Sequence, residues 1–314
     1  MILRTNVKLN FGLNVIRKRP DGYHDIETLF VPCHEFGDTL EVITGDDYSR
    51  TSASLIARYG SVHPEGLPAL GDTQPQRSEN RLRRGRTAPP DYDSELVQGL
   101  SDDGKLMITI ARAEGVDWDP MKDLCAKAYA LLAEDFKLPP VKIFLEKTAP
   151  VGAGLGGGSA DAAFTLKALN ELCSLGLSDE RLSEYASRLG SDCAFFIWNR
   201  PMFGTGRGEI LEPFDVDLSS YDLKVIVPDD ISVSTKDAYD GIVPSIGTGQ
   251  WKDLKDLLGR PVEEWRGKVV NDFEATVFKL HPELEAIKQS LYEAGATYAS
   301  MSGSGSALFA LFKK

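Results

Sequence analysis

The stretch PVGAGLGGGSADAA, residues 150–163, has the residue types and spacing of a phosphate-binding loop. Five of its fourteen residues are glycine, and it lies between a strand-like segment and an alanine-rich helical segment. Such a loop leaves backbone N–H groups unpaired at the start of a helix, where the helix dipole adds positive potential. A flexible linker or a helix-packing turn is the alternative, but linkers seldom join a strand directly to an amphipathic helix.

Two widespread phosphate loops fit this stretch poorly. A Walker loop places Lys and then Ser or Thr after its last glycine, whereas Gly158 is followed by Ser159 and Ala160. The dinucleotide pattern GxGxxG can start at Gly152, but residues 172–190 then predict a second helix instead of a strand that ends in an acid. The stretch therefore favours a phosphate loop of a third kind.

The whole stretch closely resembles the central phosphate-binding motif of the GHMP kinase superfamily, small-molecule kinases that include the homoserine, mevalonate and galactose enzymes. Residues 8–30, with PDGYH at 20–24, resemble the N-terminal signature of one branch, whose members phosphorylate 4-diphosphocytidyl-2-C-methyl-D-erythritol in the non-mevalonate isoprenoid pathway. Further matches follow in the order of that family and span almost the whole chain: LGSDCAFF (189–196), SVSTKDAY (232–239), NDFE (271–274) and SMSGSGSALF (300–309).

The resemblance implies a two-domain α/β (α+β) GHMP kinase fold, in which ATP and a small cytidine diphosphate substrate meet in the interdomain cleft. It also implies phosphorylation of the substrate's 2-hydroxyl, with Mg²⁺ bound to the nucleotide. Lys8 and Asp192 match the catalytic residues of the family, and Asn10, Tyr23 and His24 match its substrate-binding positions. The ATP phosphate loop matches Pro150, Val151, Gly152, Ala153, Gly154, Leu155, Gly156, Gly157, Gly158, Ser159 and Ala160.

Phosphoryl transfer gives the two matched charged residues definite tasks. The reaction needs in-line positioning, neutralisation of charge on the equatorial oxygens and a group that accepts the alcohol proton. Asp192 could accept that proton, and Lys8 could keep Asp192 ionised while it steadies the substrate. Without the surrounding motifs, Asp192 would be interpreted as a helix cap and Lys8 as a solvated charge. The PDG sequence predicts a turn that presents Tyr23 and His24 to a cleft.

Two features depart from the family pattern. Many members open the helix near the adenine with an Asn-Leu pair, whereas KDLCAKA (122–128) places Asp123 there. Whether the side chain at this position contacts the adenine is therefore left open. Residues 59–93 form an insertion with five prolines, four glycines and five arginines and with no periodicity, which predicts a flexible surface segment. We interpret its RLRRGR stretch (81–86) as a solvated loop in preference to an anion-binding patch.

Length, composition and charge limit the other function classes. A chain of 314 residues exceeds the usual size of a single core, which predicts two domains, and 42% hydrophobic residues are typical of a globular protein. The net charge of −12 argues against nucleic-acid or membrane partners.

The N-terminal segment is too polar for a signal peptide, which predicts a cytoplasmic protein. The cysteines and histidines lack ligand spacing, so we expect no protein-bound transition metal. The oligomeric state is left open.

Hydrophobic periodicity predicts a first domain over 1–199 and a second over 200–314, without internal repeats. In the first domain we expect strands at 38–44, 105–111 and 141–147, a helix opened by Asp119 and Pro120, and helices at 159–173 and 178–190. In the second we expect strands at 223–227 and 307–312 and helices around 234–240, 251–258, 270–279 and 283–294.

Two other functions are compatible with these patterns. One is a GHMP kinase that acts on a different small alcohol, and the other is a catalytically silent nucleotide-binding regulator that keeps the fold. The presence of Lys8 and Asp192 beside an unbroken glycine loop argues against the silent protein.

Overall fold

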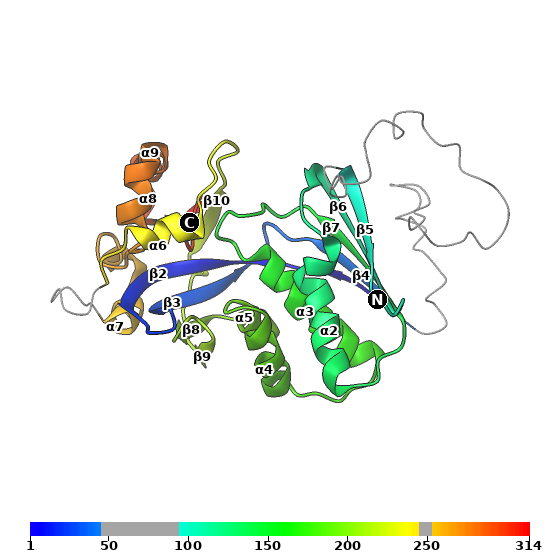
Figure 1. The fold of residues 1–314 in the computed structure, drawn as a ribbon. Helices are drawn as coiled ribbons and strands as arrows, with labels where there is room; N and C mark the ends of the chain where they lie inside the picture. The colour runs from blue at the N-terminus through cyan, green and yellow to red at the C-terminus, as the bar shows by residue number, and fades with distance from the viewer. Residues whose placement is uncertain (45–93, 245–252) are drawn as a thin grey trace, which may run out of the picture.

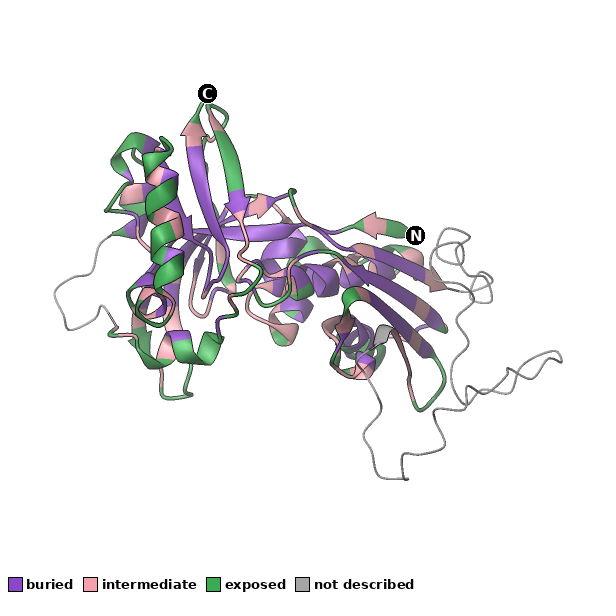
Figure 2. Ribbon diagram, turned by 90° about the horizontal axis from the view of Figure 1, so that it is seen from above, coloured by how far each residue is buried: buried purple, intermediate pink, exposed green. Residues whose placement is uncertain are grey.

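The structure, a computed structural model, describes residues 1–44, 94–244 and 253–314 of the chain (Figure 1). The expected insertion at 59–93 and its RLRRGR stretch (81–86) lie outside the described residues. In Figure 2 the buried residues follow the sheets through the middle of the molecule, and exposed residues lie on the outer faces of the helices.

A five-stranded sheet with helices against it forms the N-terminal half. Its strand pairs are antiparallel except for one parallel pair, β6 with β7. Apolar side chains from the sheet and the helices form one continuous core. The strand order is β1 (Ile2–Arg4), β4 (Thr39–Thr44), β7 (Val141–Lys147), β6 (Leu106–Val116) and β5 (Ser94–Leu100), and the helices are α2 (Leu124–Asp135), α3 (Gly157–Leu172), α4 (Asp179–Leu189) and α5 (Cys193–Trp198).

A second, four-stranded sheet connects the two halves, because its β2–β3 hairpin, called the central hairpin of the molecule below, runs from one half into the other (Figure 1). The first nine residues of β2 are all buried, and side chains of this strand enter two separate cores. The expected domain boundary at 199/200 falls just before β8, which pairs with β3. The strand order is β2 (Val7–Lys18), β3 (His24–Cys33), β8 (Met202–Thr205) and β9 (Ile210–Pro213).

The C-terminal half contains a three-stranded antiparallel sheet and short helices. The helix expected around 270–279 begins only at Glu274, because the backbone before it pairs with β2: Leu13 N–H donates to Val270 O, and Asp272 N–H donates to Leu13 O. The strand order is β10 (Tyr221–Ile226), β12 (Leu308–Lys313) and β11 (Tyr298–Met301), and the helices are α6 (Thr235–Asp240), α7 (Leu254–Leu258), α8 (Glu274–Leu280) and α9 (Pro282–Glu293).

The prediction that a helix begins at Asp119 and Pro120 is wrong about where the helix starts. Asp119 caps only a 3-10 turn, η3 (Pro120–Lys122), and α2 begins at Leu124. Asp123 is the N-cap of α2: its backbone is extended, and its carboxylate accepts a hydrogen bond from Cys125 N–H at 2.9 Å. An acidic residue suits this position because it pairs with an otherwise free helical N–H group.

A buried ionic triad fixes the segment that enters the glycine loop. The Lys147 ammonium, at the end of β7, donates to the carboxylates of Asp38 and of Asp161, the latter in α3. The Asp38 carboxylate also accepts hydrogen bonds of 2.7 Å from the backbone N–H groups of Thr148 and Ala149. The triad therefore joins the sheet, the start of the loop and the helix that follows the loop.

This triad predicts a pH-dependent stability. Burial raises the pKa of Asp161 above its ordinary value, and the Asp38 charge adds to this effect, while the Lys147 ammonium opposes it. The folded state therefore keeps this proton to a higher pH than the unfolded state, so the stabilisation is complete below the unfolded pKa of about 4 and is lost as the pH rises through the folded pKa. We expect the free energy of unfolding to fall by up to about 1.4 kcal/mol per pH unit where the two states differ by one proton.

Urea unfolding at pH 5, 6, 7 and 8 measures this dependence. Asp161→Asn should flatten it, and Asp179→Asn, at the exposed start of α4, serves as the control that should keep the wild-type slope. An Asp161→Asn variant with the wild-type slope would contradict the assignment.

Candidate active site

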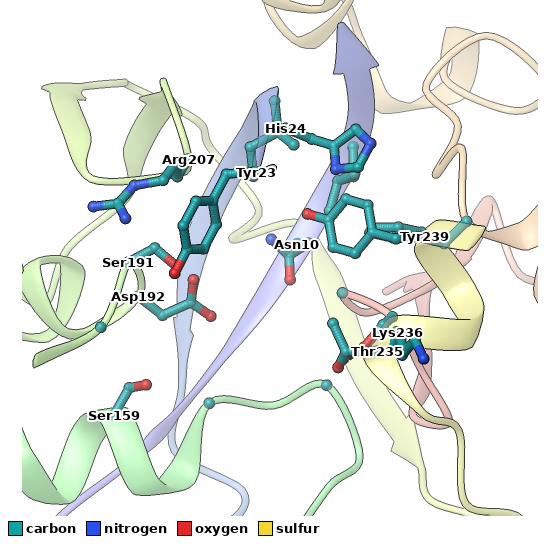
Figure 3. Close-up of a pocket in the computed structure, with 18 of the residues that line it drawn as sticks. Asn10, Tyr23, His24, Ser159, Ser191, Asp192, Arg207, Thr235, Lys236 and Tyr239 are labelled. Atoms are coloured by element: carbon teal, nitrogen blue, oxygen red, sulfur yellow. Dashed lines mark hydrogen bonds between the residues drawn. The ribbon is translucent and has the colours of Figure 1, made fainter. Parts of the chain in front are cut away.

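A cleft of about 1090 Å³ lies where the central hairpin, the glycine loop and the C-terminal half meet. On one side its walls are β2, β3 and the junction between α4 and α5. On the other side they are α6 and a second, C-terminal glycine loop, which lines the cleft at 303–304. The sequence-predicted residues Lys8, Asn10, Tyr23, His24 and Asp192 all line it. Figure 3 labels the last four of them. Residues separated by almost three hundred positions in the chain therefore form one site.

Lys8 and Asp192 are the charged centre of the cleft. The Lys8 side chain is buried on β2, and its Nζ lies 3.4 Å from Asp192 Oδ2. Asp192 precedes α5, but its carboxylate makes no capping hydrogen bond, and its side chain is 29% exposed. Asp192 is therefore not merely a helix cap, and its carboxylate is accessible from the cleft beside a positive charge.

Asn10 and the carbonyl oxygen of Gly154 hold the Lys8 ammonium in place. Lys8 Nζ donates to Asn10 Oδ1 at 2.5 Å and to the carbonyl oxygen of Gly154 at 2.9 Å. Asn10 Nδ2 donates to Thr28 Oγ1 at 3.0 Å, and Ser302 Oγ donates to the same Gly154 carbonyl at 3.2 Å. Asn10 is only 2% exposed, so its position orients Lys8 in addition to bordering the cleft.

The glycine loop needs glycine for its backbone and for close packing. Gly152, Gly154 and Gly156 each have φ of +74°, which L side chains rarely adopt. A Cβ atom on Gly154 would lie 2.2 Å from the Ser302 carbonyl oxygen, whereas a Cβ on Gly152 would meet nothing within 4 Å. Helix α3 begins at Gly157, two residues before the expected start, because Gly156 in the left-handed conformation is its N-cap.

A second cavity, of about 360 Å³, lies on the other side of the glycine loop. The loop residues 150–159 line it together with Trp118, Asp123, Leu124 and Lys147. Trp118 Nε1–H donates to Asp123 Oδ2 at 3.1 Å, so the N-cap carboxylate of α2 also holds an aromatic ring at this cavity. The two cavities share four residues of the loop: Gly152, Gly154, Gly156 and Ser159.

Aromatic rings form the outer wall of the cleft (Figure 3). Tyr23 is 57% exposed, and the Arg207 guanidinium lies 5.0 Å from its ring centroid. The His24 ring stacks on Tyr239, with centroids 4.5 Å apart and planes inclined by 18°. Burial lowers the pKa of His24, and the charge of Lys18 adds to this effect, so His24 is neutral at neutral pH.

Tyr239 and Arg207 also line the cleft, although no sequence pattern gave either residue a role. Tyr239 ends the SVSTKDAY segment, so its signal was present in the sequence as part of a motif without an assigned function. Arg207 comes after β8 and reaches the cleft only because β8 pairs with β3. Its position therefore depends on strand pairing, which no local pattern indicates.

The fold and the glycine loop define a class of protein. The family described as "GHMP kinases N terminal domain" matches residues 123–200, and "GHMP kinases C terminal" matches residues 243–314. A crystal structure of homoserine kinase from Cytophaga hutchinsonii has the same fold, with a TM-score of 0.60 and 17% identity over 99% of this chain and 86% of that one. The expected two-domain GHMP fold is confirmed, and the class is that of ATP-using small-molecule kinases.

The relatives narrow the class to one family. The 4-diphosphocytidyl-2-C-methyl-D-erythritol kinase of Bacteroides fragilis is 42% identical, over 99% of this chain and 92% of the relative. The one from Nitratidesulfovibrio vulgaris is 31% identical, over 99% and 90%. A crystal structure of 4-(cytidine 5'-diphospho)-2C-methyl-D-erythritol kinase superimposes with a TM-score of 0.62 and 26% identity, over 99% and 90%. The chain belongs to the 4-diphosphocytidyl-2-C-methyl-D-erythritol kinase family.

Within the parts of the chain that the structure describes, no helix combines the length and the apolar character of a membrane span.

The packing of the glycine loop predicts different costs for two similar substitutions. Gly154→Ala places a methyl group against the Ser302 carbonyl in a backbone conformation that alanine resists, whereas Gly152→Ala introduces only the conformational strain. We expect Gly152→Ala to lower the free energy of unfolding by about 1 kcal/mol and Gly154→Ala by clearly more, about 3 kcal/mol. Thermal and urea unfolding of both variants measure the difference, and equal losses would show that the two glycine loops are not tightly packed.

Proposed function

We propose that this protein transfers the γ-phosphoryl group of ATP to the 2-hydroxyl of 4-diphosphocytidyl-2-C-methyl-D-erythritol, a step in isoprenoid precursor synthesis. The observation that carries the proposal is the accessible Asp192 carboxylate, 3.4 Å from the Lys8 ammonium, in a cleft that shares the glycine loop with a second cavity. Relatives named for this kinase cover almost the whole chain and support the choice of substrate.

The glycine loop and the start of α3 fit the ATP phosphates. The first α-helical hydrogen bond of α3 joins Ala160 N–H to Gly156 O, so the helix does not use the N–H groups of Gly157, Gly158 and Ser159. A Cβ atom on Gly158 would meet nothing within 4 Å, so this side of the loop is open to a ligand. Unpaired N–H groups at the N-terminus of a 16-residue helix are a favourable environment for phosphate.

The second cavity suits the adenine. Its aromatic wall is the Trp118 indole, whose N–H is occupied by Asp123. Both carboxylate oxygens of Asp123 accept hydrogen bonds from the protein, and a carboxylate can accept further ones, for example from an exocyclic amino group. The aspartate that replaces the family's asparagine therefore keeps an acceptor at this wall.

Magnesium would reach the site with the nucleotide. The Ser159 hydroxyl is an oxygen group of the kind that Mg²⁺ prefers, and it lines the cleft (Figure 3). Ser159 also borders the second cavity, so its hydroxyl lies where the nucleotide and acceptor sites meet. A bound Mg²⁺ supplies neutralisation of phosphate charge.

Asp192 and Lys8 divide the work on the acceptor hydroxyl. Asp192 accepts the proton as the oxygen attacks, and the buried Lys8 ammonium stabilises negative charge on the carboxylate and the transferred group. The hydrogen bonds of Lys8 to Asn10 and Gly154 fix its position before the substrate binds. This arrangement avoids reorganisation during the transfer.

In this proposal Tyr23 and His24 bind the cytidine end of the substrate. Tyr23 offers an exposed ring face beside the Arg207 guanidinium, which suits stacking with a base near an anionic diphosphate. A neutral His24 has one donor and one acceptor nitrogen, which match the mixed donors and acceptors of cytosine.

The proposed reaction uses ATP, which fits a cytoplasmic enzyme. The net charge of −12 fits a protein without nucleic-acid or membrane partners.

The proposal predicts the effect of removing the base. Asp192→Asn keeps the size of the side chain but cannot accept the proton, so kcat should fall by about 10²- to 10⁴-fold while the affinity for the substrate changes little. Asp240→Asn changes another carboxylate that lines the same cleft and should leave kcat within about twofold of wild type.

The assay measures ADP release with the proposed substrate, mevalonate and homoserine, and calorimetry measures substrate binding. Turnover of mevalonate or homoserine alone would overturn the proposed substrate, and absence of turnover with all three would favour a silent nucleotide-binding protein. If Asp192→Asn kept wild-type turnover with chemistry rate-limiting, Asp192 would not be the base.

A further inference from the structure

The NDFE segment (271–274) matches a motif of the family, yet the proposed reaction gives its polar residues no task. Asn271, Asp272 and Glu274 line neither of the two cavities beside the glycine loop. The side chains of Asn271 and Glu274 are nevertheless buried, with 2% and 8% of their residues' surface exposed. Burial of a polar side chain is costly unless hydrogen bonds replace the lost water, so the partners of these residues indicate what the segment does.

One side of the segment is attached to strand β2. The backbone pairs with this strand, since Leu13 N–H donates to Val270 O and Asp272 N–H donates to Leu13 O. The Asp272 carboxylate also accepts a hydrogen bond of 2.7 Å from Val15 N–H. These hydrogen bonds fix the place of Asn271 relative to the strand on which the charged centre of the cleft begins.

The other side of the segment holds the C-terminal glycine loop, which follows β11. Asn271 Nδ2 donates to two backbone carbonyl oxygens, those of Met301 and Gly303, at 2.8 Å each. Its Oδ1 accepts a hydrogen bond of 3.0 Å from Phe273 N–H, which fixes the direction of the amide. The Glu274 carboxylate accepts a hydrogen bond of 2.9 Å from Met301 N–H. Both donors of the Asn271 amide therefore go to the start of the loop.

The loop that is held in this way lies against the Lys8 ammonium. Gly303 approaches so closely that a Cβ atom on it would lie 3.3 Å from Lys8 Nζ and 3.4 Å from Asn10 Oδ1. The neighbouring Ser302 Oγ donates to the Gly154 carbonyl oxygen, which also accepts a hydrogen bond from Lys8 Nζ. A shift of the loop would therefore change the surroundings of Lys8 as well as the wall of the cleft.

We propose that Asn271 is a positioning residue for phosphoryl transfer: its amide holds the C-terminal glycine loop in the place that aligns the Lys8 ammonium with the reacting groups. The inference rests on the proposed function for the transfer itself, and it holds for whichever alcohol is the acceptor. It gives the NDFE segment of the C-terminal half a task in the alignment of a lysine that lies on β2.

Asn271→Asp tests the two donors, because it keeps the size of the side chain and the acceptor for Phe273 N–H. A carboxylate would face the carbonyl oxygens of Met301 and Gly303, so the loop should move. We expect kcat to fall by about 10- to 100-fold, since a displacement of about 1 Å at an aligned site can cost that much. The dissociation constant of ADP, measured by calorimetry, should stay within about twofold of wild type, because Asn271 lies outside the second cavity and the start of α3.

Hydrogen exchange followed by mass spectrometry observes the loop itself. Peptides that cover residues 300–307 should exchange faster in Asn271→Asp than in the wild type, because the hydrogen bonds that fix the loop are lost. A role confined to general stability would instead speed exchange throughout the C-terminal half.

Asn170→Asp is the matched control. Asn170 Nδ2 donates to Leu177 O at 3.0 Å, and its Oδ1 accepts a hydrogen bond of 2.9 Å from Leu177 N–H, so this amide holds the connection between α3 and α4. Asn170 lines neither cavity, so its variant should lose stability yet keep kcat within about twofold of wild type. Turnover is compared at a temperature at which circular dichroism shows every variant folded. If Asn271→Asp does not fold, Asn271→Ala takes its place, because it removes the donors without adding a charge.

Each outcome decides between the inference and its alternatives. Wild-type kcat in a folded Asn271 variant, unchanged exchange at 300–307, or an equal loss of kcat in Asn170→Asp would overturn this inference and leave the proposed function standing. A loss of ADP affinity as large as the loss of kcat would also overturn it, by assigning Asn271 to the nucleotide site. If the wild type phosphorylates only mevalonate or homoserine, the proposed substrate is wrong, and the variants are compared with that alcohol. A wild type that phosphorylates none of these alcohols would overturn both the proposed function and this inference.

Discussion

The carbonyl oxygen of Gly154 is the point on which the site depends. It accepts hydrogen bonds from Lys8 Nζ and from Ser302 Oγ, so it joins the N-terminal strand β2, the phosphate loop and the C-terminal glycine loop at one atom. Gly154 and Gly303 allow this approach, because a Cβ atom on either would lie 3.0 Å or less from the backbone of the opposite loop. The position of the Lys8 ammonium is therefore a consequence of how the two halves of the protein pack.

Two buried lysines, one on each side of the glycine loop, determine how the loop is oriented. Lys8 is buried near the cleft, and Lys147 is buried beneath the start of α3, each with hydrogen-bond partners that offset its desolvation. An apolar core could hold the loop equally tightly, but it would not fix the orientation of an ammonium. The polar contacts therefore contribute specificity of position more than stability.

The local parts of the site were predictable from the sequence, and the contacts between distant parts were not. Glycine spacing and the alternation in 141–147 predicted the loop and β7, since both depend on neighbouring residues. The roles of Lys8 and Asp192 came from family resemblance, and the structure adds their proximity while the roles stay proposals. Asp123 as N-cap was missed because Asp119 and Pro120 form a valid capping signal for a shorter turn.

The charge of the cleft explains how an acidic protein can bind two anionic ligands. A net charge of −12 repels them at a distance, so attraction has to come from donors close to the bound position. The cations that line the cleft include Lys18, Arg207 and Lys236. The backbone N–H groups at the start of α3 are further hydrogen-bond donors, and they carry no net charge. Backbone donors do not titrate and lose no side-chain entropy on binding. In the proposed reaction they therefore suit the nucleotide phosphates, and the cations Lys18, Arg207 and Lys236 are available to the substrate diphosphate.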